Sequence, residues 1–454
     1  MLPDDALLAI FDFYVDGVQV KKKGVEAWQT LVHVCQRWRS VIFGSPRRLK
    51  LQLFCTAGTP VRDTLDVWPP LPLLIRGSDH AMPSTDNIIA ALERSDRVCQ
   101  ITLEHVTSSQ LEEIYAKMQE PFPELTHLQL GAYDESAPVV SDSFLGASAP
   151  RLRYFNLDGI PFPGLPKLLL SASHLVTLHL WNISHSGYIS PDTMATRLSA
   201  LTSLETLWLG FQSPQSRPGR ENRRPPPPTR AVLSVLTEFW FKGVTEYLED
   251  LVARIDAPQL RGLDITFFHQ LVFGTPQFAQ FISRIPMLKT PDAARLTFYD
   301  RAVRVRLLPQ TFGGGELNVG ITCRELDWQL SSLALICSSS LPSLSTVEHL
   351  YIHKPQHLQL DWQDDVDIAQ WLEILHPFIA VKNLYLSKEF APRLASSLQE
   401  LAQGRMTEVL PTLQNLFLEG LQPSGPVHEG IGQFVAVRRL SGYPISVSRW
   451  ERKW

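Results

Sequence analysis

The 454-residue sequence has few of the features that mark secreted or membrane proteins. Its five cysteines are widely scattered and never form a C-x-x-C pair, so we expect free thiols in a reducing compartment. The first residues are acidic and lack a basic leader with an apolar core, so no secretory signal is expected. The longest uncharged run, 328–347, is rich in serine and is a poor membrane span. These absences favour a soluble cytoplasmic or nuclear protein with no membrane partner.

A strong charge of either sign is also missing. The 42 Lys and Arg residues nearly balance 46 Asp and Glu residues, which leaves a net charge of −4 and no basic balance that would indicate nucleic acid. G-x-S-x-G, H-E-x-x-H and phosphate-binding loop motifs are absent, as is any paired Cys–His metal spacing. The sequence therefore predicts a non-enzymatic protein without a metal or other cofactor.

What the sequence does contain is a repeated phrase, Φ-x-x-Φ-x-Φ, in which Φ is apolar. From Val98 to Leu413 it advances 315 residues in 11 steps, about 29 residues each. Amphipathic helices are predicted between some copies, at 191–201, 244–255 and 367–375. The phrases begin at Val98, Leu125, Leu152, Leu175, Leu204, Leu236, Leu260, Ala293, Val347, Val381 and Leu413, and a less clear copy lies around Leu317 and Val319. A strand followed by a helix, repeated, predicts a parallel sheet with helices outside, in an α/β solenoid.

This pattern resembles the leucine-rich-repeat fold, in its irregular form. The resemblance implies a parallel sheet on a concave face. One departure is the absence of the usual Asn or Cys two residues after the third apolar position. Those places hold Tyr133, Ile160, Ile183, Gln212, Phe268 and Leu421. We expect apolar packing to replace most of the missing side-chain ladder.

The N-terminal residues predict a short helical hairpin. Leu7, Ile10, Phe11 and Tyr14 fall on one helix face, and Trp28, Leu31, Cys35, Trp38 and Ile42 fall on one face of a second helix. Pro3 followed by two aspartates is a favourable helix start. A hairpin of fewer than about 50 residues buries little apolar surface by itself, so it needs a partner surface.

The hairpin closely resembles the F-box, on the strength of Leu2-Pro3, Ile10-Phe11, Val34-Cys35 and Trp38-Arg39. The resemblance implies docking on the Skp-type adaptor of a cullin–RING ubiquitin ligase, while the rest of the chain selects a protein substrate. The residues that it assigns to adaptor binding are Leu2, Pro3, Leu7, Ile10, Phe11, Val34, Cys35 and Trp38.

Four regions follow from these patterns. Residues 1–48 form the F-box-like helical domain, and residues 49–97 form a connecting segment with short strands and a Pro-rich linker. Irregular leucine-rich repeats occupy 98–436, and 437–454 cap the last open edge. A disordered Arg/Pro insertion is predicted at about 213–230, either as a solvated loop, as a polyproline ligand or as a basic localisation signal.

Strand side chains alternate, so the residue between the last two apolar positions of each phrase points away from the core. Read in order, these residues are Thr102, Gln129, Asn156, His179, Trp208, Trp240, Asp264, Thr297, Tyr351, Tyr385 and Phe417. Large aromatics in solvent-facing positions indicate an interface. Two predicted substrate-binding patches follow: Trp181, Trp208 and Trp240, and Tyr351, Tyr385 and Phe417. The alternative is that neighbouring rings only stabilise the sheet.

Two function classes therefore remain. In the first, the chain is the substrate-recognition subunit of an SCF-type ubiquitin ligase. In the second, it is a leucine-rich-repeat scaffold whose hairpin recruits no ligase.

Overall fold

A computed structural model describes residues 2–18, 31, 33–44, 51–67, 70–77, 83–134, 136–216, 229–269, 274–309, 314–323, 325–339, 341–355, 368–401, 408–420 and 426–451. Trp28, Leu421 and most of the predicted Arg/Pro insertion lie outside these residues. The chain divides into two compact units. The first comprises Met1–Thr206 with Gln215–Glu221, and the second comprises Leu207–Pro214 with Asn222–Trp454.

The first unit begins with the predicted hairpin, whose described helices are α1 (Asp4–Val18) and α3 (Gln36–Gly44). The second predicted helix differs from the expectation, because it does not run unbroken through Cys35. A turn forms between Leu31 and Val34, where the Val34 amide donates to the Leu31 carbonyl at 3.3 Å. Helix α3 begins after this turn, at Gln36. Cys35 therefore precedes the helix instead of lying on its apolar face.

The remainder of the first unit is a parallel sheet in the order β1-β2-β3-β4-β5-β6. The strands are β1 (Leu51–Phe54), β2 (Leu73–Arg76), β3 (Val98–Val106), β4 (His127–Ala132), β5 (Tyr154–Asp158) and β6 (Thr177–Ile183). The predicted connecting segment thus contributes β1 and β2 to the same sheet. The helices between strands are α4 (Val61–Val67), α5 (Thr85–Leu92), α6 (Ser108–Lys117), α7 (Leu165–Leu168) and α8 (Pro191–Leu198).

Among the described residues, the main sheet of the second unit has ten strands in the order β7-β9-β11-β14-β13-β12-β15-β16-β17-β18. They are β7 (Thr206–Phe211, whose first residue belongs to the first unit), β9 (Glu238–Gly243), β11 (Gly262–Phe268), β12 (Ala293–Phe298), β13 (Val303–Leu308), β14 (Glu316–Thr322), β15 (His349–His353), β16 (Asn383–Leu386), β17 (Asn415–Glu419) and β18 (Ser446–Trp450). The helices are α9 (Thr245–Val252), α10 (Pro276–Arg284), α11 (Leu326–Ser339), α12 (Ile368–Leu375), α13 (Ala391–Leu401) and α14 (Pro426–Leu440).

The expectation of a wholly parallel sheet is wrong at one place. Strand β13 runs antiparallel to both β12 and β14, whereas β12 pairs in parallel with β15 and β14 pairs in parallel with β11. A tight turn joins β12 to β13, in which the Tyr299 amide donates to the Ala302 carbonyl at 2.8 Å. An antiparallel pair needs only such a short turn, so an extra strand enters the sheet without a crossover helix.

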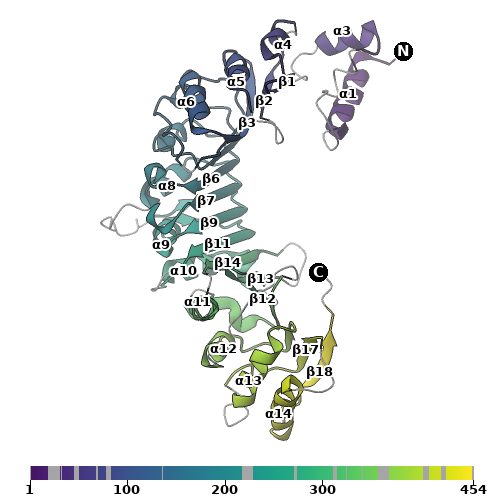
Figure 1. The fold of residues 1–454 in the computed structure, drawn as a ribbon, viewed down its shortest axis with the longest axis vertical. Coiled ribbons are helices and arrows are strands. Elements are labelled where there is room, and N and C mark those ends of the chain that lie inside the picture. The colour runs from purple at the N-terminus through teal and green to yellow at the C-terminus, as the bar shows by residue number, and fades with distance from the viewer. Residues whose placement is uncertain are drawn as a thin grey trace. The chain divides into compact units, whose positions relative to one another are not determined.

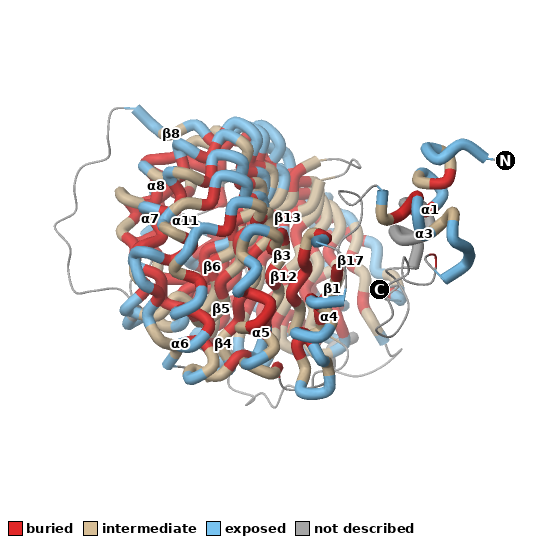
Figure 2. The backbone as a smooth tube through the Cα atoms, turned by 90° about the horizontal axis from the view of Figure 1, so that it is seen from above, coloured by how far each residue is buried: buried red, intermediate tan, exposed pale blue. Residues whose placement is uncertain are grey.

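The leucine-rich phrase builds the core of both units. In nearly every phrase the apolar positions are buried, as at Leu128 and Leu130 in the first unit and at Leu384 and Leu386 in the second, all fully buried; Ala293 is half-buried. Figure 1 shows the helices that connect successive strands on one side of those strands in each unit, and Figure 2 shows buried stretches alternating with exposed turns along the chain. We call the sheet face opposite the helices the open face. The fold is a mixed α/β solenoid whose repeating unit carries the phrase.

The turn positions that lack the usual Asn divide into two groups. Ile160 and Phe268 are buried, as the expected apolar packing requires, but Gln212 is exposed and 67% of the Tyr133 surface is exposed. Polar contacts hold some turns instead. The carboxylate of Asp134, next to Tyr133, accepts from the Ser108 amide at 2.7 Å at the start of α6.

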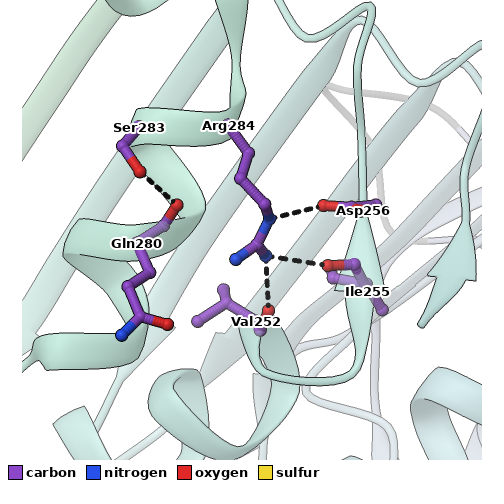
Figure 3. A network of polar contacts seen from close by, with 6 residues as sticks. All are labelled: Val252, Ile255, Asp256, Gln280, Ser283 and Arg284. Atoms are coloured by element: carbon purple, nitrogen blue, oxygen red, sulfur yellow. Dashed lines mark hydrogen bonds and ion pairs between the residues drawn. The ribbon is translucent and has the colours of Figure 1, made fainter. Parts of the chain in front are cut away.

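Polar contacts also link successive repeats on the helical side. Figure 3 shows Arg284, at the end of α10, donating from Nε to an Asp256 carboxylate oxygen at 2.7 Å. Its Nη2 donates to the carbonyls of Val252 and Ile255, each at 3.3 Å. One side chain thus joins α10 to the end of α9 and to β10 (Ile255–Asp256), the short strand paired with β8 (Ala231–Val232).

Candidate interaction surfaces

The hairpin has a small core of its own. Leu7, Phe11, Leu31 and Ile42 are buried, and the Phe11 ring lies 4.8 Å from the Trp38 ring, centroid to centroid. These contacts join α1 to α3 along their facing sides. Their burial is what holds the two helices at a fixed angle, since apolar area removed from water is the main stabilising term.

A polar contact fixes the beginning of the hairpin. Arg37, in the first turn of α3, donates from Nη2 to the Leu2 carbonyl at 2.5 Å and to the Asp4 carboxylate at 2.9 Å. The Pro3 carbonyl accepts from the Leu7 amide at 3.1 Å, so Pro3 forms the first turn of α1. Residues 2–4 are therefore held beside the start of α3.

Cys35 has a structural role that the helical-face prediction missed. Its thiol sulfur accepts from the Trp38 amide at 3.4 Å, and its carbonyl accepts from the Arg39 amide at 3.1 Å. These are the contacts of an N-cap residue. The sulfur is a weak acceptor compared with a hydroxyl. Cys35 is exposed and free, so it stays available at the hairpin surface.

The eight residues predicted to bind an adaptor differ in how far they are buried. Leu7 and Phe11 belong to the hairpin core and Trp38 is half-buried. The other five are exposed: Leu2 (53%), Ile10 (48%) and Val34 (58%), together with Pro3 and Cys35. Pro3 directly precedes α1, and Ile10 lies within it. The structure brings Leu2 and Pro3 beside Arg37, two residues from Cys35.

Of the three residues in the first predicted aromatic patch, only Trp208 and Trp240 belong to the same unit. Trp208 on β7 and Trp240 on β9 lie 6.2 Å apart, centroid to centroid, on the open face of the second unit. Trp208 is 36% exposed and Trp240 is half-buried. Trp181 is half-buried on β6 of the first unit. Exposed tryptophan is uncommon without a partner, and this pair, with 41° between the ring planes, offers an apolar surface.

The second predicted patch is a continuous stack. The Tyr351 and Tyr385 ring centroids lie 4.3 Å apart with 12° between the ring planes, and those of Tyr385 and Phe417 lie 4.5 Å apart with 7° between the planes. Directly paired register positions on β15, β16 and β17 place the three rings in line. Trp450 on β18 adds an edge contact to Tyr385 at 5.6 Å. The three rings are half-buried, so the stack both stabilises the sheet and presents its outer side.

The strand register corrects one predicted outward residue. Thr297 pairs with His353, whereas Arg295 pairs with Tyr351. The β12 phrase is therefore displaced by two residues, and Arg295 occupies the row that contains the aromatic stack. Its guanidinium lies 5.5 Å from the Tyr351 ring. Strand β13 adds Arg304 and Arg306 to the same face, opposite Thr297 and Arg295. The phrase does not occur in β13, so the sequence pattern indicated neither arginine.

On the open face of the first unit the rows contain imidazole and phenol rings. His127 stacks on Tyr154 at 4.1 Å, and His179 meets the edge of Tyr154 at 5.5 Å. Burial lowers the pKa of His179 to about 4, because the imidazolium loses its hydration there. Burial also lowers the pKa of His127, and the nearby Arg76 charge lowers it further. Both imidazoles are therefore neutral at pH 7.

Four of the five cysteines are buried in the described residues. Cys55, Cys99, Cys323 and Cys337 are buried, and burial raises the pKa of the Cys55 thiol to about 12. A buried neutral thiol is a poor nucleophile. In the part of the chain that the structure describes, no group of three or more His, Cys, Asp or Glu residues is arranged to hold a metal ion. No described helix is both long and apolar enough to cross a membrane.

Comparisons with known proteins add little to this geometry. No protein-family model matches the chain, and no curated protein matches it in sequence. Among solved structures, the leucine-rich repeat-containing protein LegL7 from Legionella pneumophila aligns with 85% of this chain and 97% of its own, at 12% identity and a TM-score of 0.30. A likeness at that score bears on neither fold nor function.

Proposed function

We propose that the protein is the substrate-recognition subunit of an SCF-type ubiquitin ligase. The N-terminal hairpin docks on the Skp-type adaptor, and the open face of the solenoid binds a protein substrate. The observation that supports this proposal is the division of the hairpin residues by burial. Leu7 and Phe11 hold the hairpin together, whereas Leu2, Ile10 and Val34 remain exposed as large apolar side chains. Exposed apolar residues beside a closed core form a surface for a partner.

Adaptor capture tests the hairpin directly. Ile10→Asp and Val34→Asp place a charge on the exposed apolar surface and leave the hairpin core intact, since neither side chain is buried. Each variant is expected to weaken binding to a purified Skp-type adaptor at least about 30-fold, the effect of losing roughly 2 kcal/mol at a hot spot. Isothermal titration with the full chain measures this change.

The matched control is Ser40→Ala. Ser40 is exposed on α3, and its hydroxyl only donates to the Gln36 carbonyl in its own helix, so adaptor binding is expected to be unchanged. Adaptor binding that survives Ile10→Asp and Val34→Asp would mean that the docking surface is misassigned. If the wild-type chain captures no adaptor, the protein is a scaffold and recruits no ligase.

Substitutions at Trp208 and Trp240 test the proposed substrate-binding surface. Trp208→Ala and Trp240→Ala are each expected to reduce capture of substrate by about 2 kcal/mol of binding free energy, because large aromatics are the commonest hot spots. Proximity labelling in cells with wild-type and variant chains measures which captured proteins are lost. A large fall in melting temperature with unchanged capture would instead assign the two rings to sheet stability.

A further inference from the structure

The strongest unassigned feature of the molecule is the outer edge of β18 in the second unit. In the part of the chain that the structure describes, β18 is the outermost strand of the sheet, and no strand pairs with its outer side. The Ser446 amide donates to the Gln414 carbonyl beside β17 at 2.8 Å. Because successive peptide groups of a strand point to opposite sides, the amides and carbonyls of Val447 and Arg449 point outward. These groups can bond a further strand.

Apolar side chains are exposed beside the same edge. Leu440 at the end of α14 is 88% exposed, Tyr443 in the following turn is 49% exposed, and Val447 on β18 is 37% exposed. An open strand edge next to exposed apolar side chains favours association with another strand. We call Leu440, Tyr443, Val447 and the outer edge of β18 the end surface.

The exposed face of α14 next to the end surface suits a helix–helix contact. Gly432 and Ala436 are exposed one turn apart, and a Cβ at Gly432 would have no atom within 4 Å. Glycine inside a helix costs about 1 kcal/mol relative to alanine, and no described contact requires it at this position. The distance between two packed helices depends on the side chains at the contact, so two small residues allow a second helix to approach closely.

Charges on this face of α14 indicate which helix approaches. Glu429 in the first turn and Arg439 in the last turn are exposed, and neither forms an ion pair with a described residue. They lie about 15 Å apart along the helix, too far for a pair within one chain. In an antiparallel pair of α14 helices with Gly432 of each copy beside Ala436 of the other, Glu429 of each copy lies beside Arg439 of the other, because both pairs are centred on position 434. The face is therefore complementary to itself.

The same two-fold axis suits β18. Helix α14 connects the parallel strands β17 and β18, so it runs antiparallel to both. Position 434 lies about 9 Å before the end of α14, and Ser448 lies about 7 Å after the start of β18. One axis can thus pass close to both positions. It pairs Val447 of each copy with Arg449 of the other, and both residues have outward backbone groups that can exchange hydrogen bonds.

We propose that the end surface and the exposed face of α14 join two copies of this chain in a symmetric dimer, with β18 antiparallel to β18 and α14 packed on α14. A two-fold contact uses the same patch on both copies, and the Glu429–Arg439 complementarity supports that arrangement. The dimer contains two hairpins and two open faces, so a partner with two binding segments is held more tightly. This contact uses neither the hairpin nor the open face, so it does not depend on the proposed function.

Sedimentation velocity on the full chain without adaptor tests the proposal. The wild type is expected to form a dimer that dissociates on dilution. Glu429→Arg and Arg439→Glu are each expected to raise the dimer dissociation constant at least about tenfold, because each places like charges together twice in the contact. The variant with both substitutions regains opposite charges between copies and is expected to restore the dimer. Melting curves check that each variant is folded.

Two further variants define the surface. Glu112→Arg makes the same charge change at an exposed position of α6 in the first unit and is expected to leave the dimer unchanged. Val447→Pro removes an outward amide without a hydrogen bond to β17 and is expected to weaken the dimer. A wild type that is monomeric at about 100 μM, or a dimer that neither charge reversal weakens, would overturn the proposal. A double charge variant that stays monomeric would overturn the antiparallel pairing of α14.

Discussion

At the scale of single residues, neighbours within one sequence motif have different roles, because some are buried and others are exposed. Ile10 and Phe11 are adjacent in the F-box-like pattern, but the Phe11 ring packs on Trp38 while 48% of the Ile10 surface is exposed. Cys35 belongs to the same pattern and caps α3 through its sulfur. The motif therefore combines residues that form the hairpin with residues left free on its surface, and only the latter can meet a partner.

His179 makes the stability of the first unit sensitive to acid. Burial lowers its folded-state pKa to about 4, whereas an unfolded histidine titrates near 6.5. Between these two values the unfolded chain binds more protons than the folded chain, so stability is lost as the pH falls from about 6.5 to about 4. His179→Gln is expected to reduce the fall in melting temperature over this window.

Melting curves recorded at about pH 7 and about pH 4.5 measure the effect. His185→Gln, at an exposed position in the turn after β6, is the control and should behave as the wild type does. Equal acid sensitivity of the wild type and His179→Gln would show that this imidazole takes no part in the transition.

At the scale of elements, the helices predicted at 191–201, 244–255 and 367–375 correspond to α8, α9 and α12. The buried positions of the strands were predictable because the phrase repeats with period-two alternation around a leucine-rich core. Strand direction was not predictable, since the same alternation suits parallel and antiparallel strands. For that reason β13 was missed, and Thr297 was placed in a row that Arg295 occupies.

Cap contacts such as that of Cys35 also depend on where a helix begins, which is the least certain feature of a sequence pattern.

The Arg284 contacts should make α10 more resistant to local opening. Arg284→Met retains much of the apolar stem but removes the ion pair to Asp256 and the bonds to the Val252 and Ile255 carbonyls. The expected loss is about 2 kcal/mol of local stability, since hydrogen bonds that involve a charged group contribute about that much. Hydrogen exchange of the α10 amides should speed up about 30-fold.

Ser283→Ala, which removes only a hydroxyl that donates to the Gln280 carbonyl at the surface, is the control for that measurement. Unchanged α10 exchange in Arg284→Met would mean that apolar packing of Phe278, Phe281 and Ile282 alone holds the helix.

At the scale of the whole molecule, we propose two separate binding surfaces. The hairpin presents apolar side chains around a closed core, and the open face of the second unit presents aromatic rings. Each surface uses different residues, so a change at one should leave binding at the other intact.

The measurement that tests this account most directly is the affinity of the full chain for a purified Skp-type adaptor, determined by titration calorimetry for the wild type, Ile10→Asp and Trp208→Ala. The account predicts that the wild type binds, that Ile10→Asp weakens binding at least about 30-fold, and that Trp208→Ala binds as the wild type does. No adaptor binding by the wild type, or equal binding by Ile10→Asp, would contradict it.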